Sequence, residues 1–204
     1  TNNGAEWSYV GSPSPYTTVR AFAAVGSSII AAAGGVDRSV DNGTTWSLVG
    51  AGLTDYVYAL AVSGTDVLAG TGSGIALSTN EGISWSSLNI GLKNTSVSSL
   101  VSITRSGIGS ASTLLAGTSG GGVFVSNNNG VSWAPSNTGL GDHLYISSLS
   151  KLGSHLFVGT NDRGLFFSVD NGETWNPVND GLTNPSIYCV VAKPPFLFAG
   201  SQGG

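Results

Sequence analysis

One eight-residue pattern returns through the chain and ends each time in tryptophan. Its full copies are residues 39–46, 78–85, 126–133 and 168–175, and residues 2–7 match the second part of a fifth copy. The tryptophans Trp7, Trp46, Trp85, Trp133 and Trp175 follow one another at intervals of 39, 39, 48 and 42 residues. Because a period of about 20–50 residues marks a repeat architecture, the fold must be built from units of roughly 40 residues.

Each unit is predicted to contain four short β-strands. A short apolar segment ending in Gly-Thr or a close variant precedes the patterns, as in residues 67–71 and 114–118. After each pattern come a glycine-rich turn and an alternating apolar strand such as residues 57–62. Glycine supplies 31 of the 204 residues, and no stretch shows helical periodicity. These units predict an all-β chain folded as a β-propeller, with one blade per unit.

The repeated pattern has a mechanical explanation as a tight turn. An Asp or Asn at its third position can accept hydrogen bonds from backbone amides, and the glycine two places later can adopt positive φ. The tryptophan then covers the apolar sheet, which contributes about 2–3 kcal/mol when the ring is enclosed. We therefore assign a structural role to Asn2, Gly4, Trp7, Ser39, Asp41, Gly43, Trp46, Ser78, Asn80, Gly82, Trp85, Ser126, Asn128, Gly130, Trp133, Ser168, Asp170, Gly172 and Trp175.

These segments resemble the Asp-box, or bacterial neuraminidase repeat (BNR), whose pattern is Ser-x-Asp-x-Gly-x-Thr-Trp. The copies ending at Trp46 and Trp175 match it fully, whereas those ending at Trp85 and Trp133 carry Asn and Ser substitutions. The resemblance spans essentially the whole chain and implies an Asp-box propeller. That family includes sialidases, other glycoside hydrolases, lectins, photosystem assembly factors and sorting receptors. The resemblance also implies that each box joins the third strand of a blade to the fourth, on the face opposite the binding face.

The predicted strands number one fewer than a five-bladed ring needs. Residues near 5–10 supply a fourth strand, four full units follow, and residues near 187–200 supply two strands, which makes 19. A closed ring of five blades has about 20 strands. We expect residues 1–204 to form a single propeller domain, most simply of five blades, in which the two chain ends share one blade. The alternatives are a fragment of a larger propeller and a ring completed by a strand from another chain.

Outside the boxes, the residues that glycosidase chemistry requires are scarce. Five of the 11 acidic residues lie in the boxes, which leaves six aspartates and no glutamate for a binding face. The two histidines and one cysteine do not make a metal-ligand set, and no glycine-rich loop leads into a helix. We therefore predict no metal, no cofactor and no catalytic residue. An aspartate pair such as Asp142 and Asp162 keeps a hydrolase open as an alternative.

Candidate ligand-binding residues come from the loops expected opposite the boxes. All five tryptophans belong to boxes, so any aromatic platform must come from tyrosine. Two tyrosines lie near acidic residues in the connections between blades, and an Asp-Arg pair lies near a turn between second and third strands. The candidate set is Tyr56, Asp142, His143, Tyr145, Asp162 and Arg163.

Charge and composition narrow the partners and the compartment. With 7 basic and 11 acidic residues the net charge is −4, which disfavours nucleic acid and anionic membrane surfaces. No apolar run approaches the roughly 18 residues of a membrane-spanning helix. Few Lys and Arg beside abundant Ser, Thr, Asn and Gly favour a secreted or cell-surface protein of a bacterium. Cys189, within an apolar run, is expected to be a small core side chain.

Together these observations predict a non-enzymatic extracellular module for binding or assembly. It would bind a glycan, a polymer or a protein through the face opposite the boxes. One alternative is a fragment of an Asp-box glycoside hydrolase. The other is a structural subunit of a larger assembly, joined by strand donation and therefore able to self-associate through its incomplete blade.

Overall fold

The computed structural model describes residues 6, 9, 11–13, 18–103, 112–142 and 144–203. Within these residues every regular element is a β-strand, so the all-β prediction is confirmed. Apart from residues 6 and 9, the strand predicted near residues 5–10 lies outside the described residues, as do Asn2, Gly4 and Trp7 of the first box. No described helix is long and apolar enough to cross a membrane.

The described strands form four antiparallel sheets of four strands and one of two strands. The first sheet contains β1 (Ala21–Val25), β2 (Ser28–Ala32), β3 (Val36–Ser39) and β4 (Ser47–Val49). The second contains β5 (Val57–Ser63), β6 (Asp66–Thr71), β7 (Gly74–Ser78) and β8 (Ser86–Ser87). The third contains β9 (Val97–Ile103), β10 (Thr113–Thr118), β11 (Gly122–Ser126) and β12 (Ala134–Pro135). The fourth contains β13 (Ile146–Leu152), β14 (His155–Thr160), β15 (Leu165–Ser168) and β16 (Asn176–Pro177). The fifth contains β17 (Ile187–Lys193) and β18 (Phe196–Ser201).

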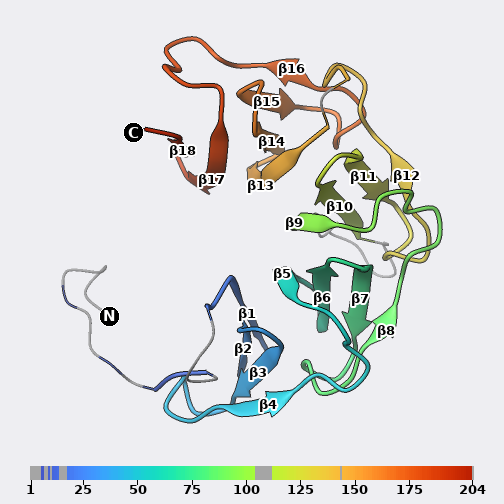
Figure 1. The fold of residues 1–204 in the computed structure, drawn as a ribbon, viewed down its shortest axis with the longest axis vertical. Coiled ribbons are helices and arrows are strands. Elements are labelled where there is room, and N and C mark those ends of the chain that lie inside the picture. The colour runs from blue at the N-terminus through green and yellow to red at the C-terminus, as the bar shows by residue number, and fades with distance from the viewer. Residues whose placement is uncertain are drawn as a thin grey trace.

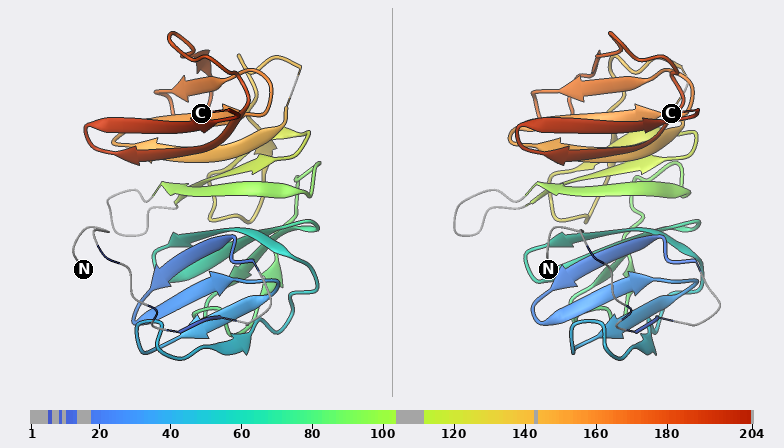
Figure 2. Two further views of the ribbon diagram at one scale, coloured as in Figure 1. Left: turned by 60° about the vertical axis from the view of Figure 1, so that its left-hand side comes forward. Right: turned by 90° about the vertical axis from the view of Figure 1, so that its left-hand side faces the viewer.

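Successive sheets follow one another around a common centre. Figure 1 shows the first strand of each sheet (β1, β5, β9, β13 and β17) toward the middle and the fourth strand at the outside. Figure 2 shows the first sheet (blue) in the lower part and the last sheet (red) in the upper part, with the third sheet (green) at a height between them. Within each sheet, strands pair with their neighbours in sequence, which is the topology of a propeller blade. Closure as a ring of five blades stays a prediction.

A β-bulge recurs at the same place in the first strand of four sheets. In β5 the register passes from Val57 to Ala59, and in β13 and β17 it passes from Ile146 to Ser148 and from Ile187 to Cys189. The ladder of β9 and β10 likewise skips Ser98. A bulge leaves one residue unpaired and redirects its side chain. The bulged residues are Tyr58, Ser98, Ser147 and Tyr188.

The hydrophobic core lies between neighbouring sheets. Leu68 of the second sheet packs in one cluster with Leu100 and Trp133 of the third, and the fourth sheet contributes Trp175 to the next cluster. Trp85, Trp133 and Trp175 therefore face the sheet that precedes their own. Their exposed fractions are 7%, 4% and 2%, so all three rings are enclosed between sheets.

The first and last sheets each present one apolar face that described residues leave open. Trp46 is half-buried and lies against Phe22, with ring centroids 6.2 Å apart, while Phe22 itself is 58% exposed. On the last sheet, Phe198 is 57% exposed and Cys189 is exposed as well. The expectation that Cys189 is a core side chain is therefore wrong. Its strand is present, but Cys189 lies opposite Gly200 on a sheet face that no described residue covers.

Candidate functional site

The boxes form the turns between third and fourth strands, as the resemblance implied. In the first box, the Ser39 hydroxyl donates to Asp41 Oδ1 at 2.8 Å and accepts the Gly43 amide at 2.8 Å. Asp41 also accepts the Thr45 amide at 2.8 Å. The other three described boxes repeat these contacts, with an amide replacing the carboxylate at Asn80 and Asn128. The box residues are thus occupied in holding their own turns.

A left-handed residue between the Asp/Asn and the glycine is a feature that the sequence analysis missed. Asn42, Glu81, Asn129 and Asn171 have φ of 56–59°. Asparagine tolerates this conformation better than most residues, so its presence in three of the four described boxes could have predicted a positive φ at this position.

The box carboxylates are held in their charged form. Hydrogen bonds from the Thr45 side chain and amide and from the Ser39 hydroxyl lower the pKa of Asp41 to about 2. The Ser168 hydroxyl, followed by the side chain and amide of Thr174, lowers the pKa of Asp170 to about 2. Such bonds stabilise a carboxylate and not a carboxylic acid, so neither group is suited to donate a proton in catalysis near neutral pH.

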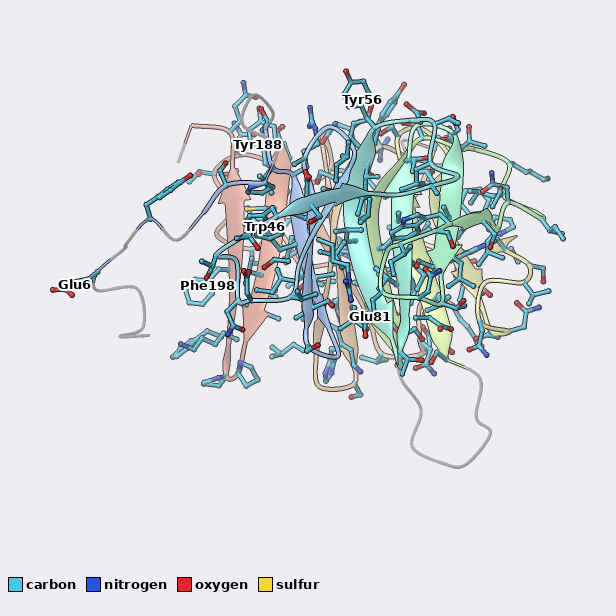
Figure 3. The ribbon with its side chains drawn as sticks, turned by 90° about the horizontal axis from the view of Figure 1, so that it is seen from below. Glu6, Trp46, Tyr56, Glu81, Tyr188 and Phe198 are labelled. Atoms are coloured by element: carbon cyan, nitrogen blue, oxygen red, sulfur yellow. The ribbon has the colours of Figure 1, made fainter. Side chains whose placement is uncertain are left out.

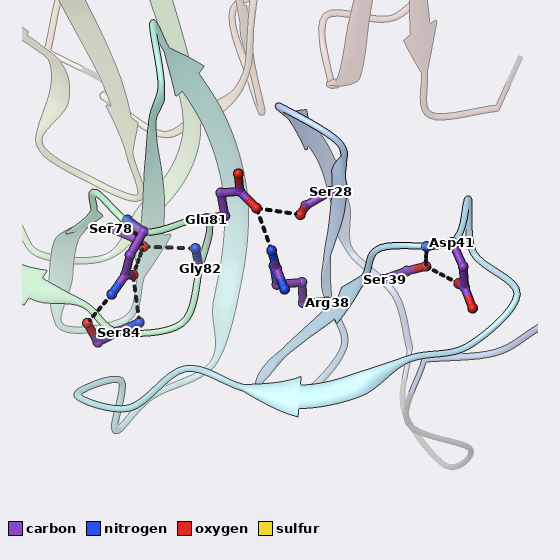
Figure 4. A network of polar contacts seen from close by, with 9 residues as sticks. Ser28, Arg38, Ser39, Asp41, Ser78, Glu81, Gly82 and Ser84 are labelled. Carbon is purple, nitrogen blue, oxygen red and sulfur yellow. Dashed lines mark hydrogen bonds and ion pairs between the residues drawn. The ribbon is translucent and has the colours of Figure 1, made fainter.

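Glu81 replaces asparagine in the second box and connects two sheets. Figure 4 shows its carboxylate turned toward the first sheet, where it accepts a bond from Ser28 at 2.6 Å and pairs with Arg38. The hydroxyl of Ser28 is the main cause of a lowered Glu81 pKa, followed by the hydrogen bond from Arg38. Because Ser28 and Arg38 both bond to it, Glu81 has a structural role, which accounts for a glutamate at a position with positive φ.

On the opposite face, asparagines at the ends of the fourth strands hold the turns between second and third strands. Asn89 accepts the Ile75 amide at 2.8 Å and donates to the Ser73 carbonyl at 2.9 Å. Asn137 and Asn179 repeat both bonds in the third and fourth sheets. In the first sheet the equivalent residue is Gly50, which cannot make them.

A second set of Asp and Asn residues fastens the connections from one sheet to the next. Asp55 accepts the Tyr56 amide at 2.7 Å and the Ser73 hydroxyl at 2.8 Å. Asn94 and Asn184, each three residues after the same glycine of the repeat, bond to a nearby amide and to a carbonyl of the adjacent turn. Asp142 occupies the equivalent position of its repeat. A loop-fixing role therefore competes with the predicted ligand-binding role of Asp142.

Three of the four bulged residues, Tyr58, Ser98 and Ser147, meet at a central cavity of about 690 Å³. It is lined by Thr18, Val19, Arg20, Tyr58, Ser96, Ser98, Ser119 and Ser147. Arg20 occupies the position of the first sheet that the bulged Tyr58, Ser98 and Ser147 hold in later sheets. Its guanidinium carbon lies 5.3 Å from the centre of the Tyr58 ring, which is a cation–π contact.

The serines of this cavity have a defined hydrogen-bonding direction. The Ser98 hydroxyl donates to the Ile146 carbonyl at 2.6 Å, and the Ser147 hydroxyl donates to the Gly159 carbonyl at 2.9 Å. Since each hydroxyl has one proton, which it gives to a carbonyl, both oxygens keep lone pairs that can accept a further hydrogen bond. The cavity therefore combines hydrogen-bond acceptors on the third and fourth sheets with a cation and an aromatic ring on the first two.

The cavity lies on the face opposite the boxes. Figure 3 shows Tyr56 and Tyr188 along one face of the molecule and Glu81, from a box, toward the other. Tyr56 and Tyr145 immediately precede first strands, at equivalent positions, and are 60% and 52% exposed. Tyr145 forms an isolated bridge with Ser119, which places its backbone at the rim of the cavity.

The structure separates the predicted ligand-binding residues into three places. Tyr145 lies at the central cavity, whereas Tyr56 lines another of about 420 Å³ with Gly34 and Gly35. Asp162 and Arg163 line a cavity of about 650 Å³ beside Gly141, which precedes Asp142. His143 lies outside the described residues. Among the described residues, no group of three His, Cys, Asp or Glu side chains is placed to hold a metal ion.

Sequence reasoning missed Arg20, Ser98 and Ser147 as cavity residues. A signal for them exists in the repeats themselves. The residue before the bulge is always Val or Ile, at Val57, Val97, Ile146 and Ile187, and Val19 takes that place in the first sheet. The next residue varies between Arg, Tyr and Ser. A position that varies among otherwise similar repeats, inside a constant frame, is not fixed by the needs of the fold.

The comparisons with known proteins agree with this architecture. A family model of the BNR/Asp-box repeat matches residues 166–177, which contain the box ending at Trp175. The chain therefore carries an Asp-box repeat on a propeller-type fold. A comparison with curated proteins gives no match.

Solved structures of several proteins share this Asp-box propeller's fold. An ancestral GH74 enzyme is 22% identical, with a TM-score of 0.68 over 90% of this chain and 27% of its own. YCF48 from Cyanidioschyzon merolae is 15% identical, with a TM-score of 0.68 over 92% of this chain and 65% of its own. An extracellular domain from B. thetaiotaomicron is 17% identical, with a TM-score of 0.68 over 92% of this chain and 27% of its own. The Asp-box propeller thus spans about a quarter of the GH74 enzyme and two thirds of YCF48.

Proposed function

We propose that this Asp-box propeller is a non-enzymatic module that binds a carbohydrate polymer in its central cavity. The observation that carries the proposal is the set of bulged and neighbouring residues that converge there from four sheets. A cavity of about 690 Å³ accommodates a few sugar units, and serine oxygens, an arginine and tyrosine rings are groups that bind sugar hydroxyls and faces.

The loop face also offers room for a polymer to continue beyond the cavity. Two further cavities, of about 650 and 420 Å³, open on the same connections between sheets. Exposed Tyr56 lines the smaller one, and exposed Tyr145 stands at the central rim. Repeated weak contacts along one ligand raise overall affinity without any single strong site.

We further propose an extracellular location, as the composition suggested. An extracellular domain from B. thetaiotaomicron has the same fold, which supports this location. A secreted module also meets the polysaccharides that lie outside cells, which are the ligand class of this proposal.

The test is affinity electrophoresis against a panel of soluble polysaccharides, followed by calorimetry on the best ligand. The double variant Tyr58→Ser/Tyr145→Ser carries residues that the third sheet has at the equivalent positions, Ser98 and Ser96, so the fold should be kept. We expect about a tenfold loss of affinity, because each ring contributes stacking area. The control is the box-face variant Val131→Thr, which introduces the residue that the first box has at the same position, and it should bind as the parent does.

Two results would contradict the proposal. One is unchanged affinity in the double-tyrosine variant together with weakened binding in Val131→Thr, which would place the ligand on the box face. The other is release of new reducing ends that stops in the variant Asp142→Asn/Asp162→Asn, which would establish the hydrolase alternative.

A further inference from the structure

We propose that the central cavity recognises a carboxylate, and that Arg20 is the residue that contacts it. The ligand class is then an oligosaccharide that contains uronic acid units. This inference rests on the carbohydrate-binding function proposed above and specifies its ligand.

Arg20 presents a positive charge that an anionic ligand can contact. Its side chain is exposed in the cavity lining, and the Tyr58 ring holds the guanidinium by the contact of 5.3 Å. Among the residues that the structure describes, Arg20 forms no ion pair with a carboxylate. A planar guanidinium can bind both oxygens of a carboxylate at once, which favours this group over a single hydroxyl.

The other arginines described differ from Arg20 in their surroundings. Arg38 is paired with Glu81 on the box face. Arg163 shares its cavity with Asp162. The lining of the central cavity contains neither Asp nor Glu, so Arg20 makes the local charge positive in a chain of net charge −4.

The serines indicate which chemical groups the ligand carries besides its carboxylate. Ser98 and Ser147 donate their protons to carbonyls and therefore offer acceptors, which repel a carboxylate and attract hydroxyl donors. A ligand that satisfies the whole lining has a carboxylate at one side and hydroxyl groups at the other. Uronic acid units have this arrangement.

The experiment measures binding of short oligomers of galacturonate, mannuronate and glucuronate by calorimetry, each against its carboxyl methyl ester. The ester keeps every hydroxyl and removes the charge. We expect at least one acid oligomer to bind about tenfold more tightly than its ester, as a charge-assisted bond of this kind provides. Adding salt from 50 to about 300 mM should reduce that preference.

A matched pair of variants assigns the preference to its residue. Arg20→Ser introduces the residue found at this position in the third and fourth sheets, so it should fold and should bind acid and ester equally. Lys151→Ser, which removes an exposed cation of β13 outside the lining of the central cavity, should keep the tenfold preference. Tetraglutamate serves as a charged competitor without sugar hydroxyls.

Each outcome has one meaning. Equal binding of all acids and esters would overturn the inference and leave carbohydrate binding intact. Binding of no oligosaccharide, acidic or neutral, would overturn both. A preference that survives in Arg20→Ser would remove Arg20 from the site. Displacement of the oligouronates by tetraglutamate at equal concentration would show that the cavity recognises only the negative charge of its ligand, and would overturn the uronic acid assignment.

Discussion

The third residue of each box holds its turn through the same acceptor, whether that residue is Asp or Asn. Asp41 accepts the Thr45 amide at 2.8 Å, and Asn80 accepts the Ser84 amide at 2.9 Å. The difference lies in the second bond. The Thr45 hydroxyl donates to Asp41 at 2.6 Å, whereas Asn80 itself donates to Ser84. The carboxylate boxes therefore depend on charge and the amide boxes do not.

This difference predicts that acid weakens the two boxes that contain Asp41 and Asp170 more than the two that contain asparagine. The pKa values of Asp41 and Asp170 are about 2 in the folded chain, against an ordinary value of 3.8. Because the unfolded chain takes up these protons first, their contribution to stability is complete above about pH 4 and is lost as the pH falls toward 2. The variant Asp41→Asn/Asp170→Asn should therefore lose less stability than the parent between pH 4 and pH 2. Thermal unfolding followed by circular dichroism measures this, and identical losses in the two proteins would refute it.

At the scale of the element, glycines allow three of the described connections between sheets to pass close to the next box. Gly52, Gly91 and Gly139 have φ of 83–94°, and a Cβ at any of them would meet the carbonyl oxygen of the following box tryptophan. Two requirements, backbone conformation and lack of space, thus coincide at these three residues, whereas Gly181 of the next connection meets only the first.

These two requirements can be separated by mutation. Gly153→Ala changes a turn glycine with φ of 62° and no atom near the added methyl group, so it should cost about 1 kcal/mol from backbone strain alone. Gly139→Ala adds the collision with Trp175 and should cost clearly more. Urea unfolding of both variants gives the comparison. Equal losses would mean that the connection shifts away from the box at no cost.

At the scale of the whole molecule, stability comes from the contacts between sheets. Trp175 is 2% exposed and its Nε1 donates to the Ser136 carbonyl of the third sheet at 2.9 Å. Trp133 likewise donates to the Leu88 carbonyl of the second sheet at 2.9 Å. Trp46 is half-buried and donates to Gly43 within its own box. The box tryptophans therefore contribute different amounts to the stability of the molecule in different sheets.

Alanine substitution should reveal this difference. Trp175→Ala removes a buried ring and a bond to the neighbouring sheet, and should lower the free energy of unfolding by about 3–5 kcal/mol. Trp46→Ala should cost less than half as much, because much of its ring area is already in contact with solvent. Denaturant unfolding of the two variants tests the ratio, and a larger loss at Trp46 would contradict its half-buried position on the first sheet.

The sequence was sufficient to predict the strands, the box turns and their place between third and fourth strands. These features depend on contacts within a few residues, such as the bond from Gly43 to Ser39, and so they leave a local pattern. The central cavity brings Arg20, Tyr58, Ser98 and Ser147 together from four repeats, and only a comparison of the repeats with one another, not the pattern within any one of them, marks these positions. Cys189 shows a related limit, since strand periodicity does not tell which face of a sheet is covered.

The bonds from Trp133 and Trp175 to the preceding sheet have a consequence for how the chain can be divided. A piece that ends after its fourth strand lacks the indole ring that should cover its outer side, since that ring belongs to the following repeat. The unit that can be moved, duplicated or deleted is therefore offset from the visible sheet. A piece that ends just after a box tryptophan keeps that ring on the preceding sheet, so the tryptophans, and not the sheet borders, are the better C-terminal ends for shorter versions of the chain.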